Sequence, residues 1–206
     1  MTSRYTRTIN KKNEPSSFWP TFTDMICSIL MVVILLLFSN ESIYETVQDD
    51  LANKITDKIE YNFENENIIV DEVSGKITFK ESMMFDVDSY ELKAEAKIML
   101  NEFIPLYIKT IYESYGDNID KITITGHTDD SGSYLHNLDL SQERALSVSK
   151  YIMSDEIGSY EYKDQVLFDI EAIGKSESEL IKDKYGNTDS KASRRVEIMY
   201  ELNIEK

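Results

Sequence analysis

A single acidic residue, Asp24, stands inside the most apolar part of this chain. The run from Met25 to Phe38 is 14 residues without a charge, and it extends back to Phe18 to give 21 residues in which Asp24 is the one charged side chain. A helix of that length spans roughly 31 Å, the thickness of the hydrocarbon core of a bilayer. We therefore expect residues 18–39 to form a transmembrane helix that carries a carboxylate.

Two features favour a retained anchor over a cleaved signal peptide. The residues that follow the apolar run, Ser39-Asn40-Glu41, contain no small-x-small cleavage site. Phe18 and Trp19 would lie at the membrane interface, and Pro20 suits the first turn of a helix, where its missing N–H costs nothing. Because basic residues gather in the tail 1–17, the N-terminus is expected in the cytoplasm and the body outside the inner membrane.

The carboxylate of Asp24 has two interpretations. A charge near the centre of a spanning helix costs about 2.5–3.5 kcal/mol on insertion scales, so the first is an ion site shared with a partner. The alternative is an interfacial side chain that snorkels toward water, since Asp24 lies roughly 9 Å along the helix from Phe18. Thr21 and Ser28 lie within a turn of Asp24 and form a polar patch with it, which favours a helix packed in a bundle.

Charge and cysteine content exclude some classes of protein. The formal net charge is -16, from 38 acidic and 22 basic residues, so the body lacks the basic footprint of a nucleic-acid-binding protein. The one cysteine, Cys27, cannot form a disulfide within the chain. It is either a small apolar residue of the anchor or a cross-link to a second copy.

The rest of the chain alternates between strand and helix patterns. Apolar residues recur every fourth position in the segment 40–65, which predicts a linker helix before a domain at 66–206. Within that domain, strands are expected at 67–70, 76–79, 119–126, 166–173 and 195–202, and helices at 91–115 and 140–157. Pro105 should kink or split the first helix. This order predicts an α/β sandwich with a mixed sheet and helices on one face.

Three separated motifs carry a resemblance. They are Gly126-His127-Thr128-Asp129, the run from Asn137 to Arg144, which contains Leu140-Ser141, and Ser193-Arg194-Arg195-Val196-Glu197. In this order they resemble the OmpA-like peptidoglycan-binding domain, over about residues 66–203. The resemblance implies that Asp129 and Arg144 grip the diaminopimelate of a stem peptide. It also implies supporting roles for three further residues, Thr128, Asn137 and Arg195.

The charges of Asp129 and Arg144 are complementary to the two charged groups of that ligand. A carboxylate pairs with the ligand's ammonium, while a guanidinium takes its carboxylate in a two-pronged contact. Ser193 stands where the family often has Asn, so this edge of the site departs from the pattern. The alternative is that Asp129 and Arg144 pair with each other and bind nothing.

Catalysis and cofactors are not expected. The two histidines, His127 and His136, with Asp129 and Asp130 match no established metal-ligand spacing. The sequence holds no nucleophile with a nearby base, no phosphate-binding loop and no dinucleotide fingerprint. We predict a protein that is not an enzyme and that needs neither a metal nor a cofactor.

The two halves together resemble the B subunit of ion-driven stators, the family of MotB. The aromatic entry Phe18-Trp19-Pro20-Thr21-Phe22-Thr23-Asp24 and the OmpA-like domain carry this resemblance. It implies a homodimer within a ring of five MotA-like membrane subunits, with Asp24 taking up and releasing the ion. A lone carboxylate suits a proton better than sodium, but both ions stay open.

Two short runs point to a particular branch of that family. The segment from Gly132 to Ser141, and the spelling Ser193-Arg194-Arg195-Val196-Glu197, are similar to the ZorB subunits of Zorya anti-phage systems. The resemblance implies a ZorA-like partner and a role in defence against phage. The alternatives are a stator of the flagellum or of other motility, a passive wall tether, and an energy transducer like the ExbD and TolR proteins.

Overall fold

The computed structural model describes residues 22–36, 68–71 and 74–203, in two compact units, Met1–Tyr44 and Glu45–Lys206. The predicted boundaries after residues 17, 39 and 65 fall outside the described residues, as does the predicted linker helix.

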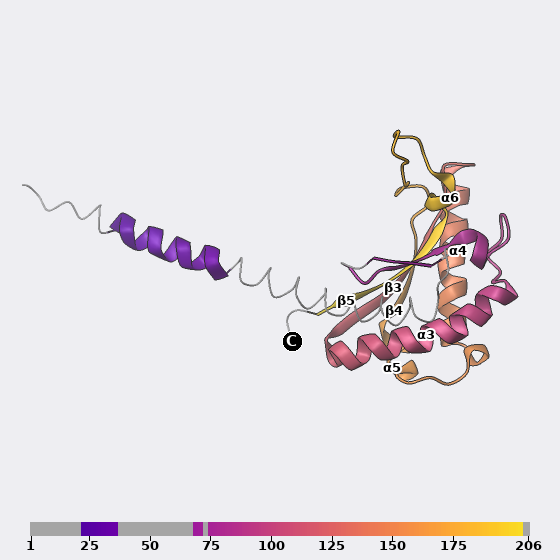
Figure 1. Cartoon of the computed structure of the whole chain (residues 1–206), viewed down its shortest axis with the longest axis horizontal. Helices are drawn as coiled ribbons and strands as arrows, with labels where there is room; N and C mark the ends of the chain where they lie inside the picture. Colours follow the sequence, from indigo (N-terminus) through magenta and orange to yellow (C-terminus); the bar gives the residue numbers. More distant parts are fainter. Residues whose placement is uncertain (1–21, 37–67, 72–73, 204–206) are drawn as a thin grey trace, which may run out of the picture. The chain divides into compact units, whose positions relative to one another are not determined.

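The first unit contributes one helix, residues 22–36 (Figure 1). The side chains of this helix are all exposed. Ser28 Oγ donates a hydrogen bond of 2.8 Å to the backbone carbonyl of Asp24, four residues earlier. This contact satisfies the serine hydroxyl within the helix itself. In the part of the chain that is described, no helix is long and apolar enough to cross a membrane.

A five-stranded sheet forms the centre of the second unit, in the order β1-β2-β5-β3-β4. The strands are β1 (Ile68–Val70), β2 (Ile77–Lys80), β3 (Ile119–His127), β4 (Ile170–Gly174) and β5 (Arg195–Leu202). β3 and β4 are parallel, and the other neighbouring pairs are antiparallel. The predicted mixed sheet is therefore confirmed.

The helices are α2 (Glu81–Met84), α3 (Ala94–Tyr115), α4 (Tyr134–Met153), α5 (Lys163–Asp169) and α6 (Ser190–Ser193), with short 3-10 turns at Gly116–Asn118 and Asp155–Ile157. In the register of the sheet Ile77, Ile198 and Ile124 lie side by side, each at most 1% exposed. They belong to the same buried cluster as the apolar side chains of α3 and α4. Both helices thus pack on one face of the sheet, as alternation along each strand requires.

Two sequence predictions fail at the level of elements. The segment predicted as one strand, 166–173, begins as helix α5 and becomes a strand at Ile170. Val166 is buried, but Leu167 and Phe168 are 47% and 88% exposed, so this apolar run does not fill a strand position in the core. Helix α3 runs unbroken through Pro105. Proline there removes only the hydrogen bond to the carbonyl of Asn101, which lies on an exposed residue open to water.

Helix α4 begins six residues earlier than expected, at Tyr134, where Ser133 caps it by accepting from the backbone N–H of His136. The predicted caps Asp139 and Ser141 instead lie within the helix. This longer helix matters for the site, because it brings Asn137 and Arg144 onto one element.

Candidate functional site

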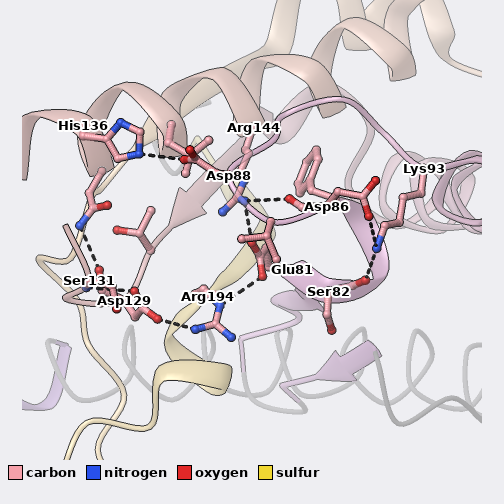
Figure 2. A pocket seen from close by; sticks show the side chains of 15 residues that line it. Glu81, Ser82, Asp86, Asp88, Lys93, Asp129, Ser131, His136, Arg144 and Arg194 are labelled. Atoms are coloured by element: carbon pink, nitrogen blue, oxygen red, sulfur yellow. Dashed lines mark hydrogen bonds and ion pairs between the residues drawn. The ribbon is translucent and has the colours of Figure 1, made fainter. Parts of the chain in front are cut away.

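A pocket of about 470 Å³ opens where four segments of the second unit meet (Figure 2). Its walls come from α2 and the loop after it, from the chain that leaves β3, from the first half of α4, and from the residue before β5. The charged residues that line it are Glu81, Asp86, Asp88, Lys93, Asp129, Arg144 and Arg194.

Close packing of α4 on the ends of β3 and β4 fixes the position of this helix beside the pocket. A Cβ atom on Gly126, at the end of β3, would lie 2.1 Å from the carbonyl oxygen of Ser141 on α4. One on Gly174, at the end of β4, would lie 2.5 Å from the backbone nitrogen of Gln142. Only glycine permits so close an approach. Asn137 and Arg144 lie two helical turns apart around this contact, so both reach the same pocket.

Arg144 is the deepest charge of the site, with 2% of its surface exposed. Its Nε donates to the carbonyl of Ser89 at 2.8 Å, and its Nη2 donates to Glu81 Oε1 at 2.6 Å. The guanidinium also lies 5.3 Å from the centre of the Phe85 ring. Burial lowers the pKa of Arg144, and the negative charge of Glu81 opposes that effect in part.

Asp129 is held on the opposite side of the pocket and is 5% exposed. It forms an ion pair with Arg194 and accepts from the backbone N–H of Ser131 at 3.0 Å. Burial alone would raise the pKa of Asp129, but these contacts outweigh it and hold the pKa below its ordinary value. The carboxylate is therefore charged at neutral pH, and its charge is already paired with Arg194.

These groups form a charge chain of four residues, Arg144–Glu81–Arg194–Asp129, in which the sign alternates. Arg194 links its two halves, because its Nε donates to Glu81 Oε2 at 3.2 Å and its Nη1 reaches Asp129. Figure 2 shows Glu81 between the two arginines. Asp129 and Arg144 thus have separate partners, and the expected alternative of a direct pair between them is not what the structure has.

The predicted site residues divide into two groups. Four of them line the pocket: Thr128, Asp129, Asn137 and Arg144. Asn137 donates to the carbonyl of Asp129 at 3.2 Å and to Glu177 at 2.6 Å, so it ties the β3 loop to α4. Within the described residues, the buried hydroxyl of Thr128 has no hydrogen-bond partner.

Arg195 is placed elsewhere. It does not line the pocket but bonds Glu197 at 2.6 Å and the carbonyls of Glu179 and Ser193. Its neighbour Arg194 lines the pocket in its place, as the second guanidinium there beside that of Arg144. Successive side chains at the start of a strand point to opposite sides, so of two adjacent arginines only one can face the pocket. That alternation was available from the sequence, but it did not say which arginine faced which side.

Glu81 is the other residue that sequence reasoning missed. It lies outside the three motifs, and no spacing in the chain ties it to Arg144, which is 63 positions away. In the described part of the chain, no three His, Cys, Asp or Glu side chains are grouped to hold a metal ion. What the pocket presents is a buried guanidinium and a buried carboxylate, the pair that an amino-acid zwitterion requires.

The family model for the OmpA family matches residues 84–195, more than half of the 206 residues. The chain belongs to the OmpA family. The matched segment contains Asp129, Asn137 and Arg144, and it ends at the pair Arg194-Arg195. The predicted OmpA-like domain is thereby confirmed.

Two proteins named Zorya protein ZorB, from different strains of Escherichia coli, are similar to this OmpA-family chain. One is 27% identical and covers 95% of this chain and 92% of its own length. The other is 28% identical over 62% of this chain and 57% of its own length. The predicted resemblance to ZorB is confirmed, and in the first case it includes the N-terminal part.

Two further proteins are similar to this chain, one in sequence and one in fold. The uncharacterized protein YtxE of Bacillus subtilis is 25% identical over 92% of this chain and 90% of its own length. A putative MotB-like protein from Desulfovibrio vulgaris, known from its crystal structure, is 19% identical. It covers 77% of this chain and 93% of its own, with a TM-score of 0.54, which supports the shared fold.

Proposed function

We propose that this chain is the B subunit of an ion-driven inner-membrane complex, anchored to the cell wall through the pocket of its OmpA-family domain. The observation that carries the proposal is the presence of a buried guanidinium, Arg144, and a charged carboxylate, Asp129, in one pocket of about 470 Å³. The similarity to ZorB along 95% of the chain supports the joining of both halves in one function.

The ligand that fits best is the free amino-acid end of a diaminopimelate stem peptide. Its carboxylate would be bound by Arg144 and its ammonium by Asp129. Asn137 keeps the two walls at a fixed separation through its bonds to Asp129 and Glu177. Binding and release, without chemical change of the ligand, is all that the role requires.

Asp24 is proposed as the ion-carrying group. The helix that bears it would span the inner membrane from a cytoplasmic N-terminus, as a homodimer inside a ring of ZorA-like subunits. One charge crossing the membrane is worth about 2.3 kcal/mol per 100 mV. A carboxylate that is protonated and released once per passage can convert this energy into rotation of the ring. We propose the proton as the ion and defence against phage as the biological role.

The wall-binding part is tested by pelleting the full-length, detergent-solubilised chain with purified diaminopimelate-type sacculi. Changing Arg144 to Ala removes a charged hydrogen-bonding group worth about 1.5–3 kcal/mol, so the affinity should fall roughly tenfold or more. Lys150→Ala is the matched control, since it removes an exposed positive charge from the same helix. Equal pelleting of wild type and Arg144→Ala would refute the site.

The ion-carrying part is tested in vesicles that contain the chain together with its membrane partner. Asp24→Asn keeps the size of the side chain but cannot exchange a proton, so proton flux should disappear while the complex still assembles. Leu30→Val, on a different face of the same helix, changes no polar group and serves as the control. Equal proton leak from wild type and Asp24→Asn would refute this role and favour a passive tether.

A further inference from the structure

Glu81 of this chain already binds the guanidinium that the proposed ligand needs. Glu81 Oε1 accepts from Arg144 Nη2 at 2.6 Å, and the two side chains are 10% and 2% exposed. The position of Glu81 is fixed at the first residue of α2, where its backbone N–H donates to the carbonyl of Arg194 at 3.1 Å. A carboxylate of the chain therefore lies where a ligand carboxylate would bind.

The guanidinium of Arg144 already has protein acceptors on groups that a ligand carboxylate would use. A carboxylate can take two hydrogen bonds from either of two edges of an arginine, Nε with Nη2 or Nη1 with Nη2. Nη2 belongs to both edges, and its acceptors are Glu81 Oε1 at 2.6 Å and the carbonyl of Asp86 at 3.5 Å. The Nε group is donated to Ser89. Each edge contains one of the two N–H bonds of Nη2, so a ligand carboxylate that takes both hydrogen bonds of an edge competes with the acceptors that Arg144 already has, and Glu81 is the charged one among them.

Glu81 has a second ion-pair partner, Arg194, which can hold it when it leaves Arg144. Its other oxygen accepts from Arg194 Nε at 3.2 Å, and the Arg194 side chain is 34% exposed at the pocket mouth. If Glu81 leaves Arg144, it keeps an ion pair and does not become an unpaired buried charge, the state that would cost most. Two arrangements of the same charge chain are thus available, one closed and one open to a ligand.

We infer that Glu81 is an internal competitor for the ligand carboxylate, and that the wall ligand binds by displacing Glu81 from Arg144. The inference rests on the proposed wall-binding function and adds its regulation. The apparent affinity is the intrinsic affinity reduced by the fraction of molecules in which Arg144 is free. Any change in the chain that draws Glu81 toward Arg194 therefore tightens attachment to the wall without altering the contacts of the ligand.

The opposite role for Glu81 makes the opposite prediction. If Glu81 helped to bind the ammonium of the ligand, as Asp129 is proposed to do, its neutralisation would weaken binding. If it only stabilised the fold, its neutralisation would lower the melting temperature and leave the affinity of the folded protein unchanged.

The experiment measures binding of the full-length, solubilised chain to diaminopimelate-type sacculi, with lysine-type sacculi as the reference surface. Glu81→Gln keeps the size of the side chain, but its neutral amide is a weaker acceptor for Arg144. Should Arg144 be free in about one wild-type molecule in ten, Glu81→Gln should bind up to roughly tenfold more tightly. Glu81→Ala, which vacates the space, should also bind more tightly. Melting temperatures report whether each variant is folded.

Two controls separate this inference from the function on which it rests. Glu95→Gln removes an exposed negative charge from α3 and should bind like wild type. The double variant Glu81→Gln/Arg144→Ala should bind no better than Arg144→Ala alone, because the gain acts through Arg144. Unchanged or weaker binding by folded Glu81 variants, with Arg144→Ala still impaired, overturns the inference and leaves the proposed function standing. Undiminished binding by Arg144→Ala overturns both.

Discussion

At the scale of single residues, the second unit keeps two buried ionic groups apart. One is the charge chain of the pocket, and the other centres on Glu197 in β5. Glu197 lies 2.6 Å from Arg195 Nε, 3.2 Å from Lys76 Nζ and 3.6 Å from His127 Nε2. The first group is proposed to bind a ligand, whereas the second holds the start of β5 to its neighbouring strands.

Glu197→Gln should destabilise the fold in a way that depends on pH. Burial raises the pKa of Glu197, but its contacts with His127 and Arg195 lower it by more, so the pKa lies well below its ordinary value. Breaking a buried pair of this kind costs roughly 3 kcal/mol at pH 7. A depressed folded pKa means that the stabilisation is complete above the unfolded pKa of about 4.3 and is lost as the pH falls toward the folded value.

Urea unfolding of the two proteins at pH 7 and below pH 4 measures this difference. The difference in free energy of unfolding between wild type and Glu197→Gln should be largest at pH 7 and should become smaller in acid. Glu201→Gln, an exposed acid on the same strand, should cost less than about 0.5 kcal/mol at either pH. A gap of constant size would show that the charge of Glu197 is not what stabilises β5.

Sequence reasoning went furthest at residues that belong to motifs. Asp129, Asn137 and Arg144 were expected at one site, and they line one pocket. It could not predict a partner from a distant segment that carries no motif, such as Glu81. It also stopped at Arg194 and Arg195, because identical neighbours differ only in the face to which each points, and one sequence does not fix that register.

At the scale of elements, the contact of α4 with the ends of β3 and β4 positions the site. Gly126→Ala should force the helix away from the sheet, since its Cβ would lie 2.1 Å from the Ser141 carbonyl oxygen. Overpacking of this kind costs about 1–3 kcal/mol or more. We expect a lowered melting temperature together with weaker binding to sacculi, because Asn137 and Arg144 move with the helix.

The control for that prediction is Glu143→Ala, which changes an exposed residue of the same helix. It should leave both the melting temperature and sacculus binding close to the wild-type values. Gly126→Ala protein with an unchanged melting temperature would contradict the close packing described here.

Most elements could be predicted from periodicity, and the failures have physical causes. The three inner strands of the sheet, β2, β5 and β3, were expected near their observed positions, because each is rich in apolar and β-branched residues. The three apolar residues 166–168 predicted a strand, yet Leu167 and Phe168 are exposed and the segment is helical. Hydrophobicity alone does not separate a short helix from a strand. In α3, tertiary packing overrides the usual effect of Pro105.

At the scale of the whole molecule, the proposed function joins a membrane helix to a wall-binding domain. In a non-motile host that carries the complete operon, both Asp24→Asn and Arg144→Ala should abolish protection in a plaque assay. The first removes the ion-carrying group, and the second removes the anchor against which the complex exerts force. Lys150→Ala should protect like wild type.

Each other outcome has a distinct meaning. Protection that survives Asp24→Asn would contradict an ion-driven role and favour a passive tether. Protection that survives Arg144→Ala would show that wall binding through this pocket is not required for defence. A wild-type operon that gives no protection would point to a motility stator instead.

The most direct test of the central claim is a titration of the full-length, solubilised chain with meso-diaminopimelate, followed through the arginine side-chain N–H signals in nuclear magnetic resonance spectra. Arg144 and Arg194 line the pocket, while Arg195 bonds Glu197 outside it and is an internal control. We predict that the signals of Arg144 and Arg194 shift with increasing ligand and that the signal of Arg195 stays in place. Signals of Arg144 and Arg194 that do not move, or that move no more than that of Arg195, would contradict the claim that this pocket binds the wall.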